Sequence, residues 1–165
     1  MEIQALVDQL QNGPLYRFID WPVTAIPKHA AGVYTIWDSD GGFLYVGMAG
    51  RSLDEEAVWS LRSLDGPPKG LWDRLGSHAS GRRSGDQFCV YVADVLVLPK
   101  LRRSEIEEIA AGDLSFDSVV KDFTRRHLSF RFVETASGRD ALALESIVLS
   151  EGLSGVLALF NSTVE

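Results

Sequence analysis

The chain has 165 residues, of which 45% are hydrophobic and 24% charged, as is typical of one globular domain with a sizeable core. Its formal net charge of −7 argues against a protein that coats nucleic acid non-specifically, although a small basic cleft on an acidic body is compatible with it. The single cysteine, Cys89, excludes an internal disulfide framework and predicts a cytoplasmic location, and no apolar run approaches the roughly 20 residues of a membrane span.

The first part of the chain predicts a helix, a loop and a hairpin. Residues 2–11 have the apolar period of a helix, and the segment TAIPKHAAG at 24–32 is a predicted loop. Residues 33–37 and 43–46 are rich in β-branched and aromatic side chains, which favours strands. Asp40-Gly41 between them is a strong hairpin signal.

The middle of the chain mixes short helices with an apolar run. A short helix is predicted around Ala57–Leu64, ended by the breaker Gly-Pro-Pro at 66–68. The segment LWDRLGSHASG at 71–81 predicts another helix between glycines. Phe88–Leu98 is apolar and β-branched, so it is the best candidate for a buried central strand, with Cys89 as a buried thiol.

The last part of the chain predicts three helices and one strand. Their approximate bounds are 104–111 and 116–127 for the first two helices, 128–134 for the strand, and 137–151 for the last helix. Ser104 with Glu107, and Ser137 with Asp140, have the spacing of capping boxes. Helices and strands mix without strict alternation, which favours an α+β fold.

The predicted hairpin would place two tyrosines together. If Asp40-Gly41 is a two-residue loop, Ile36 lies opposite Tyr45, and Tyr34 shares the face of Ile36. The two phenols are then diagonal neighbours, whereas a slip of one residue would put them on opposite faces. The simpler alternative is that both tyrosines are ordinary half-buried strand residues.

A carboxylate in the last predicted helix has an unusual position. Glu145 has Ala141 and Leu142 one turn before it and Val148 and Leu149 one turn after it. A charge on such an apolar face is costly unless an arginine, a set of donors or a metal ion compensates it. Two interpretations stay open, an internal Arg–Glu pair and a magnesium site with a single carboxylate.

A second constellation lies in the predicted helix at 71–81. Arg74 and His78 are four residues apart and share a helix face, an arrangement that suits an anion such as phosphate. Arg82 and Arg83 follow in a loop rich in Gly and Ser. Taken alone, this pattern also fits a solvated Arg and His on a surface helix.

Together these features resemble the GIY-YIG nuclease family. Five elements stand in family order across residues 32–161, namely GVY at 32–34, YVG at 45–47 after ten intervening residues, LWDRLGSH at 71–78 with Arg74 and His78, ALALES at 141–146 with Glu145, and LFNS at 159–162 with Asn161. The glycine-flanked tyrosines of the hairpin thereby gain a functional interpretation.

The resemblance implies a small three-stranded antiparallel sheet flanked by helices, within an α+β fold. The whole chain, 1–165, would form one domain with an N-terminal helical extension at 1–30 and helical insertions at about 52–70 and 99–128. Either Phe88–Leu98 or Leu128–Glu134 could be the third core strand.

The resemblance also implies hydrolysis of nucleic-acid phosphodiester bonds, with DNA as the expected substrate. Tyr34 would act as the general base, and Tyr45 would share a hydrogen bond with the water or with Tyr34. A phenol with a pKa near 10 is a poor base unless positive charge lowers that value, which Arg74 and a metal ion could do. Glu145 would hold one Mg²⁺ or Mn²⁺ ion, and Arg74 would stabilise the transition state.

Further residues take supporting roles in this interpretation. His78 could contact a phosphate oxygen or assist proton transfer, and Arg51, Arg82, Arg83 and Asn161 are expected to bind nucleic acid, with Asn161 supporting the site. No separate DNA-reading module is visible, so a homodimer or a protein partner could supply specificity.

Two alternatives to a nuclease remain at this stage. One is a non-catalytic module of the same fold that binds nucleic acid or protein, as the acidic charge would favour. The other is a plain α+β interaction protein with a buried Arg–Glu pair, in which Tyr34 and Tyr45 do not converge on Glu145.

Overall fold

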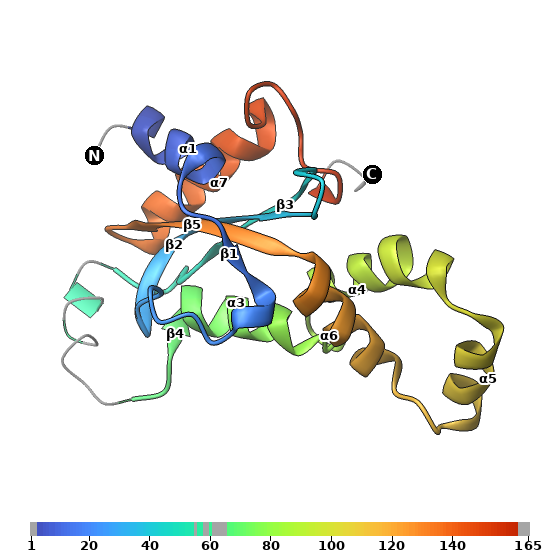
Figure 1. Ribbon diagram of the computed structural model, residues 1–165. Coiled ribbons are helices and arrows are strands. Elements are labelled where there is room, and N and C mark those ends of the chain that lie inside the picture. Colours follow the sequence, from blue (N-terminus) through green and yellow to red (C-terminus); the bar gives the residue numbers. More distant parts are fainter. Residues whose placement is uncertain (1–2, 55, 58–59, 61–65, 162–165) are drawn as a thin grey trace.

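The computed structural model in Figure 1 describes residues 3–54, 56–57, 60 and 66–161. The fold is α+β, as the sequence predicts, with a central sheet covered by helices on both faces. The strands are β1 (Tyr16–Arg17), β2 (His29–Trp37), β3 (Phe43–Ala49), β4 (Lys69–Gly70) and β5 (Ser129–Thr135). The α-helices are α1 (Ile3–Asn12), α3 (Leu71–Ser80), α4 (Gln87–Tyr91), α5 (Arg103–Ala111), α6 (Phe116–His127) and α7 (Gly138–Glu151). Shorter or irregular helical segments are η1 (Phe18–Asp20), η2 (Val92–Val97) and η3 (Leu98–Lys100).

In the described part of the chain the sheet has five strands, so the expectation of a small three-stranded sheet is wrong. The strands lie in the order β1-β5-β2-β3, and β4 pairs in parallel with the start of β2. The three long strands are antiparallel, and the third of them is β5, which the 128–134 candidate predicts. The additional strands β1 and β4 have two residues each. Segments this short have no readable period, which is why the sequence does not reveal them.

Each face of the sheet has its own apolar core. Val33 points towards α1 and α7, in a cluster with Leu10 and Val148. Tyr34 and Ile36 point the other way, into a larger cluster that includes residues of α3. In Figure 1, α1 and α7 accordingly lie on one side of the sheet and α3 and α6 on the other. Strand β2 runs between both cores and is buried from His29 to Ile36, so packing on both faces fixes the positions of its side chains.

The hairpin between β2 and β3 keeps the predicted tyrosine register although its turn is longer than two residues. Ile36 pairs with Tyr45, as expected, but Trp37 pairs with Phe43 after an irregularity in the ladder. The Asp38 carboxylate closes the turn by accepting hydrogen bonds from two main-chain N–H groups, those of residues 40 and 42, at 2.9 and 2.7 Å. The one-residue difference is absorbed before the ladder reaches the tyrosines, which therefore share a face.

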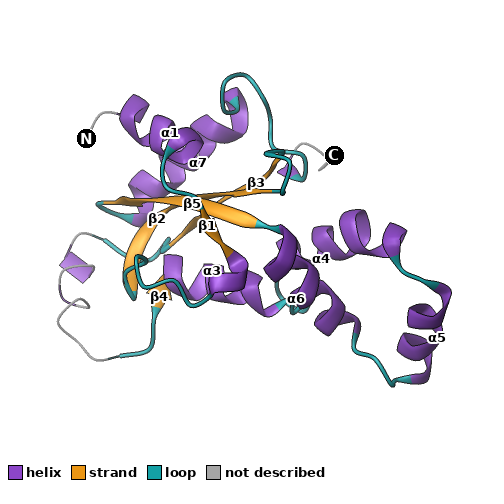
Figure 2. Cartoon of the chain, viewed as in Figure 1, coloured by secondary structure: helices purple, strands orange, loops and turns teal. Residues whose placement is uncertain are grey.

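The predicted strand at Phe88–Leu98 is wrong, because this segment is helical. It forms α4 followed by the π-helix η2, and Figure 2 shows α4 among the helices. Asp86 caps α4 by accepting the main-chain N–H of Cys89 at 3.2 Å. The buried side chains recur with helical spacing, at Phe88, Cys89, Val92, Ala93 and Val97. A continuous apolar run fits a buried helix as well as a buried strand, so the apolar pattern alone does not distinguish them.

The other predicted helices are confirmed with small shifts at their ends. Helix α5 begins one residue early, at Arg103, so Ser104 lies inside the helix and does not cap it. The Glu105 carboxylate accepts the main-chain N–H of Arg102 at 2.8 Å. Ser137 caps α7 by accepting the main-chain N–H of Asp140, as predicted. The predicted helix at 57–64 falls largely outside the described residues. No helix in the described part of the chain has the length and apolar character that a bilayer crossing requires.

Candidate active site

Side chains from β2, β3, α3 and α7 meet at one pocket of about 390 Å³. Its lining includes every residue predicted to be catalytic or metal-binding, together with one predicted phosphate contact: Tyr34, Tyr45, Arg74, His78, Glu145 and Arg51. Convergence of this kind contradicts the alternative in which the two tyrosines lie apart from Glu145. The fold therefore supplies a single place where phenol, imidazole, guanidinium and carboxylate can act on one ligand.

The glycines of the GVY and YVG motifs are required by close packing. The Tyr34 ring lies across Gly47, where a β-carbon would overlap the phenolic oxygen. A β-carbon at Gly32 would overlap the carbonyl of Val133 on the neighbouring strand. The rings of Tyr34 and Tyr45 have centroids 6.3 Å apart. Each glycine thus lets a tyrosine-bearing strand approach its neighbours closely.

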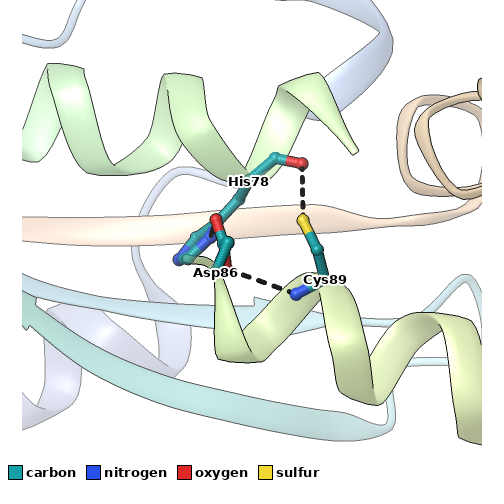
Figure 3. A group of neighbouring side chains, drawn as sticks. All are labelled: His78, Asp86 and Cys89. Atoms are coloured by element: carbon teal, nitrogen blue, oxygen red, sulfur yellow. Dashed lines mark hydrogen bonds and ion pairs between the residues drawn. The ribbon is translucent and has the colours of Figure 1, made fainter. Parts of the chain in front are cut away.

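A chain of short hydrogen bonds runs inward from the pocket. The Tyr34 hydroxyl lies 2.7 Å from Nε2 of His78, and Nδ1 of the same imidazole lies 2.7 Å from the Asp86 carboxylate. All three side chains are buried, with exposed fractions of 1% for Tyr34 and 2% for His78 and Asp86. Figure 3 shows His78 against Asp86, with Cys89 on the following helix. The pocket is therefore backed by a dry Tyr–His–Asp arrangement.

The charges within this arrangement are set by burial and hydrogen bonding. Burial lowers the pKa of His78 and outweighs the opposing effect of Asp86, so the imidazole is neutral near pH 7. Burial alone would raise the pKa of Asp86, but hydrogen bonds from His78, Ser77 and the main chain of Cys89 reverse this and lower it. A neutral imidazole has one N–H and one bare nitrogen, so His78 donates one of its two hydrogen bonds and accepts the other.

The charge of Arg74 alone does not bring the pKa of Tyr34 below that of a free phenol. Burial and the neighbouring Tyr45 raise the pKa of Tyr34 well above that of a free phenol, and the opposing charge of Arg74 is outweighed. Burial and the charge of Glu145 raise the pKa of Tyr45 to about 12. Both phenols are neutral at physiological pH, so neither acts as a preformed phenolate.

Glu145 is half-buried, and its cationic surroundings can be followed for the described residues. Burial raises its pKa, while a hydrogen bond from Met48 and the charges of Arg51 and Arg74 oppose that effect. Among the residues that the structure describes, no lysine or arginine forms an ion pair with it. This contradicts the internal Arg–Glu pair as far as described arginines are concerned. A carboxylate held this way at a pocket wall can take up a divalent cation.

Three residues predicted to bind nucleic acid lie outside the lining of this pocket. Arg83 pairs with Asp117 at 2.6 Å and lies over the Phe116 ring. Arg82 lines a separate hollow beside α3. The Asn161 amide accepts the main-chain N–H of Val46 at 2.8 Å and donates to its carbonyl at 3.1 Å, so it holds β3 next to Tyr45. Asn161 is thus a structural support of the site.

Asp86 is the site residue that sequence reasoning missed. The apolar run after Asp86 is predicted as a strand, and an aspartate before a strand has no expected structural role. An aspartate three residues before Cys89, at the start of a helix with buried side chains at 88, 92 and 97, is an N-cap signal that would have located it.

Two groups of residues could be considered for a metal ion. Glu145 fits one Mg²⁺ or Mn²⁺ ion, because a hard cation accepts one carboxylate and completes its shell with phosphate and water oxygens. His78, Asp86 and Cys89 have ligand atoms within 4.8 Å of one another. Their polar atoms already bond to each other and to Tyr34, and burial raises the pKa of the Cys89 thiol, which opposes metal binding there. Glu145 is therefore the better candidate ligand.

Comparison of the chain with protein-family models, with curated proteins and with solved structures gave no match. The function is therefore inferred from the geometry of the pocket.

Proposed function

We propose that the protein is a metal-dependent endonuclease that hydrolyses phosphodiester bonds in nucleic acid, DNA in the first instance, in the manner of the GIY-YIG nucleases that its motifs resemble. The observation that supports this proposal most is the meeting of Tyr34, Arg74 and Glu145 at one pocket, with His78 behind the tyrosine. Three chemical needs of phosphodiester hydrolysis, a proton acceptor, a cation and a metal ligand, are thereby met in one place.

Substrate phosphate would bind against the two arginines of the pocket. Arg51 and Arg74 supply positive charge at the wall that also carries Glu145. A guanidinium can form two parallel hydrogen bonds to phosphate oxygens, and it stabilises the extra negative charge of the transition state. Because the chain has a net charge of −7, the positive charge of these two arginines is local. Binding of nucleic acid would therefore depend on the pocket more than on the rest of the surface.

The proton of the attacking water would leave through Tyr34 and His78. As the water oxygen bonds to phosphorus, the bond from phosphorus to the leaving oxygen breaks, and the leaving oxygen takes up a proton from solvent. One proton of the attacking water passes to the Tyr34 oxygen while the phenolic proton passes to Nε2 of His78, 2.7 Å away. Tyr34 ends as a neutral phenol and His78 as an imidazolium. This route requires no phenolate beforehand, which reconciles a tyrosine base with the raised pKa of Tyr34.

Glu145 would hold the divalent ion. When bound, that ion supplies Lewis-acid stabilisation of the scissile phosphate and of the leaving oxygen. Glu145 lies on α7, whereas the arginine and the histidine that line the same pocket lie on α3. The residues that hold the metal and those that accept the proton therefore come from different elements and can be varied separately.

A non-catalytic binding module is the second candidate, and the acidic net charge favours it. Such a module would use the same arginines to hold a phosphate and would have no need for proton transfer. The two candidates differ in whether a covalent bond is broken, so a cleavage assay separates them.

The test is nicking of supercoiled plasmid in Mg²⁺ by the wild type and by Tyr34→Phe and Glu145→Ala. Tyr16→Phe and Glu107→Ala are matched controls, because Tyr16 packs on Phe130 and Glu107 is an exposed residue of α5. We expect each site variant to lose about 100-fold or more in rate, and each control to stay within about twofold of the wild type.

Unchanged nicking in both site variants would reject the site. If every protein is inactive but Arg74→Ala weakens binding of labelled DNA, the binding module is the better description. Thermal melting of each variant shows whether an activity loss comes from unfolding.

A further inference from the structure

Asp86 makes more hydrogen bonds than a helix cap requires. One carboxylate oxygen accepts from Nδ1 of His78 at 2.7 Å and from the Ser77 hydroxyl at 2.8 Å. The other accepts the main-chain N–H of Cys89 at 3.2 Å. With an exposed fraction of 2%, the carboxylate is fixed between α3 and the start of α4, and every one of these partners is a donor.

We propose that Asp86 is a positioning residue that fixes His78 in the tautomer with a proton on Nδ1, so that its bare Nε2 must receive the proton of Tyr34. A neutral imidazole carries one N–H, and the carboxylate can only accept, so the proton stays on the Asp86 side. The Tyr34 hydroxyl then points its hydrogen at Nε2 and turns its lone pairs away from the imidazole. The effect on catalysis rests on the proposed function, whereas the tautomer does not.

The same carboxylate would stabilise His78 once it has taken up the proton. The charged groups around the imidazole are Asp86, which favours its protonation, and Arg74, which opposes it. The phenols of Tyr34 and Tyr45 also lie against the ring, with ring centroids 5.3 and 6.2 Å away. An imidazolium buried here without Asp86 would be an uncompensated charge. The carboxylate thus both aims the acceptor and stabilises its charged form.

Asp86→Asn is the informative variant because it keeps the helix cap. Asparagine caps helices as well as aspartate does, and the fixed N–H of Cys89 requires the amide oxygen on its side. The amide NH₂ then faces His78 and Ser77. His78 can accept a hydrogen bond from it by moving its own proton to Nε2, and the Ser77 hydroxyl can accept one directly. In that tautomer Nε2 no longer accepts from Tyr34.

The tautomer is measured by ¹⁵N NMR of the imidazole rings in the intact protein. The chain has three histidines, and loss of one set of signals in His78→Gln assigns the ring of interest. We expect a protonated Nδ1 and a bare Nε2 in the wild type, and the reverse in Asp86→Asn. A bare Nδ1 in the wild type, or an unchanged tautomer in Asp86→Asn, would overturn the proposal. This readout holds whether or not the protein is a nuclease.

The kinetic consequence is measured by plasmid nicking. We expect Asp86→Asn to lower kcat by about 100-fold or more with little change in KM or in Mg²⁺ dependence. Ser77→Ala, which removes a donor to Asp86 but leaves the bond to His78, is the matched control and should stay within about threefold. A reversed tautomer with wild-type nicking would overturn the kinetic half of the proposal and the proton route through His78. Absence of nicking in the wild type would count against the nuclease function and leave the NMR result standing.

Discussion

Replacing Asn161 by alanine distinguishes a structural role of this residue from nucleic-acid binding. Its side-chain amide makes two hydrogen bonds to the main chain of Val46, one as acceptor at 2.8 Å and one as donor at 3.1 Å. Val46 lies on β3, which ends the strand order on one side of the sheet, and directly follows Tyr45. Alanine leaves both main-chain groups without these partners.

The expected loss of stability follows from the two bonds. Each is worth about 1 kcal/mol net, so Asn161→Ala should destabilise the protein by about 2 kcal/mol. For a chain of this size that corresponds to a fall in Tm of about 4–8 °C. Asn161→Asp is a nearly isosteric second variant, which keeps the acceptor for the Val46 N–H but turns an oxygen towards the Val46 carbonyl. We expect it to destabilise the protein at least as much as alanine does.

Urea unfolding followed by circular dichroism gives the free energies. Asn12→Ala is the control, because Asn12 makes an exposed side-chain bond to Asp8 one turn away, and its loss should cost no more than about 0.5 kcal/mol. If Asn161→Ala unfolds like the wild type but binds labelled DNA more weakly, the structural assignment is wrong and Asn161 is a ligand-contacting residue.

Three further predictions concern titration and packing. Burial lowers the pKa of His78, so the unfolded chain takes up a proton before the folded chain does as the pH falls below about 6.5. The free energy of unfolding should therefore drop between about pH 7.5 and 5, and it should drop less in His78→Gln. Equal pH dependence of the two free energies in urea unfolding would contradict this. Because burial raises the pKa of Tyr34 and of Tyr45, the latter to about 12, their stabilising effect is complete below about pH 10 and is lost above it. Absorbance at 295 nm should show late ionisation of these two tyrosines, and the absence of any late ionisation would be inconsistent with it. Gly47→Ala should lower stability by about 1–3 kcal/mol in thermal melts. Gly66→Ala is the control and should cause no change, because its β-carbon meets open space. Equal melting temperatures of the two variants would refute the close packing of Gly47 on Tyr34.

Much of the fold is predictable because its signals are local. Period and turn residues locate β2, β3, α6 and α7, and the register that unites Tyr34 with Tyr45 follows from the hairpin. The strands β1 and β4 are too short for any period to appear. The apolar run at Phe88–Leu98 satisfies both helical and extended patterns, and long-range packing against α6 and the sheet decides its state.

The site was predictable as a set of residues and less so as a chemical environment. The resemblance to the GIY-YIG motifs nominates Tyr34, and the apolar neighbours of Glu145 in the sequence mark that carboxylate as unusual. The protonation of Tyr34 depends on how deeply the folded chain buries it, a property that no local pattern contains, and burial outweighs Arg74. The role of Asp86 depends on the contact between the end of α3 and the start of α4, which only the folded chain creates.

The most direct test of the central claim is a double-variant measurement of plasmid nicking. Single-turnover rates in Mg²⁺ are compared for the wild type, Tyr34→Phe, Glu145→Ala and the combined variant. If both residues serve one reaction in one pocket, the combined variant should be no slower than the slower single variant by more than about threefold. Full multiplication of the two losses, or wild-type rates in either single variant, would contradict the account.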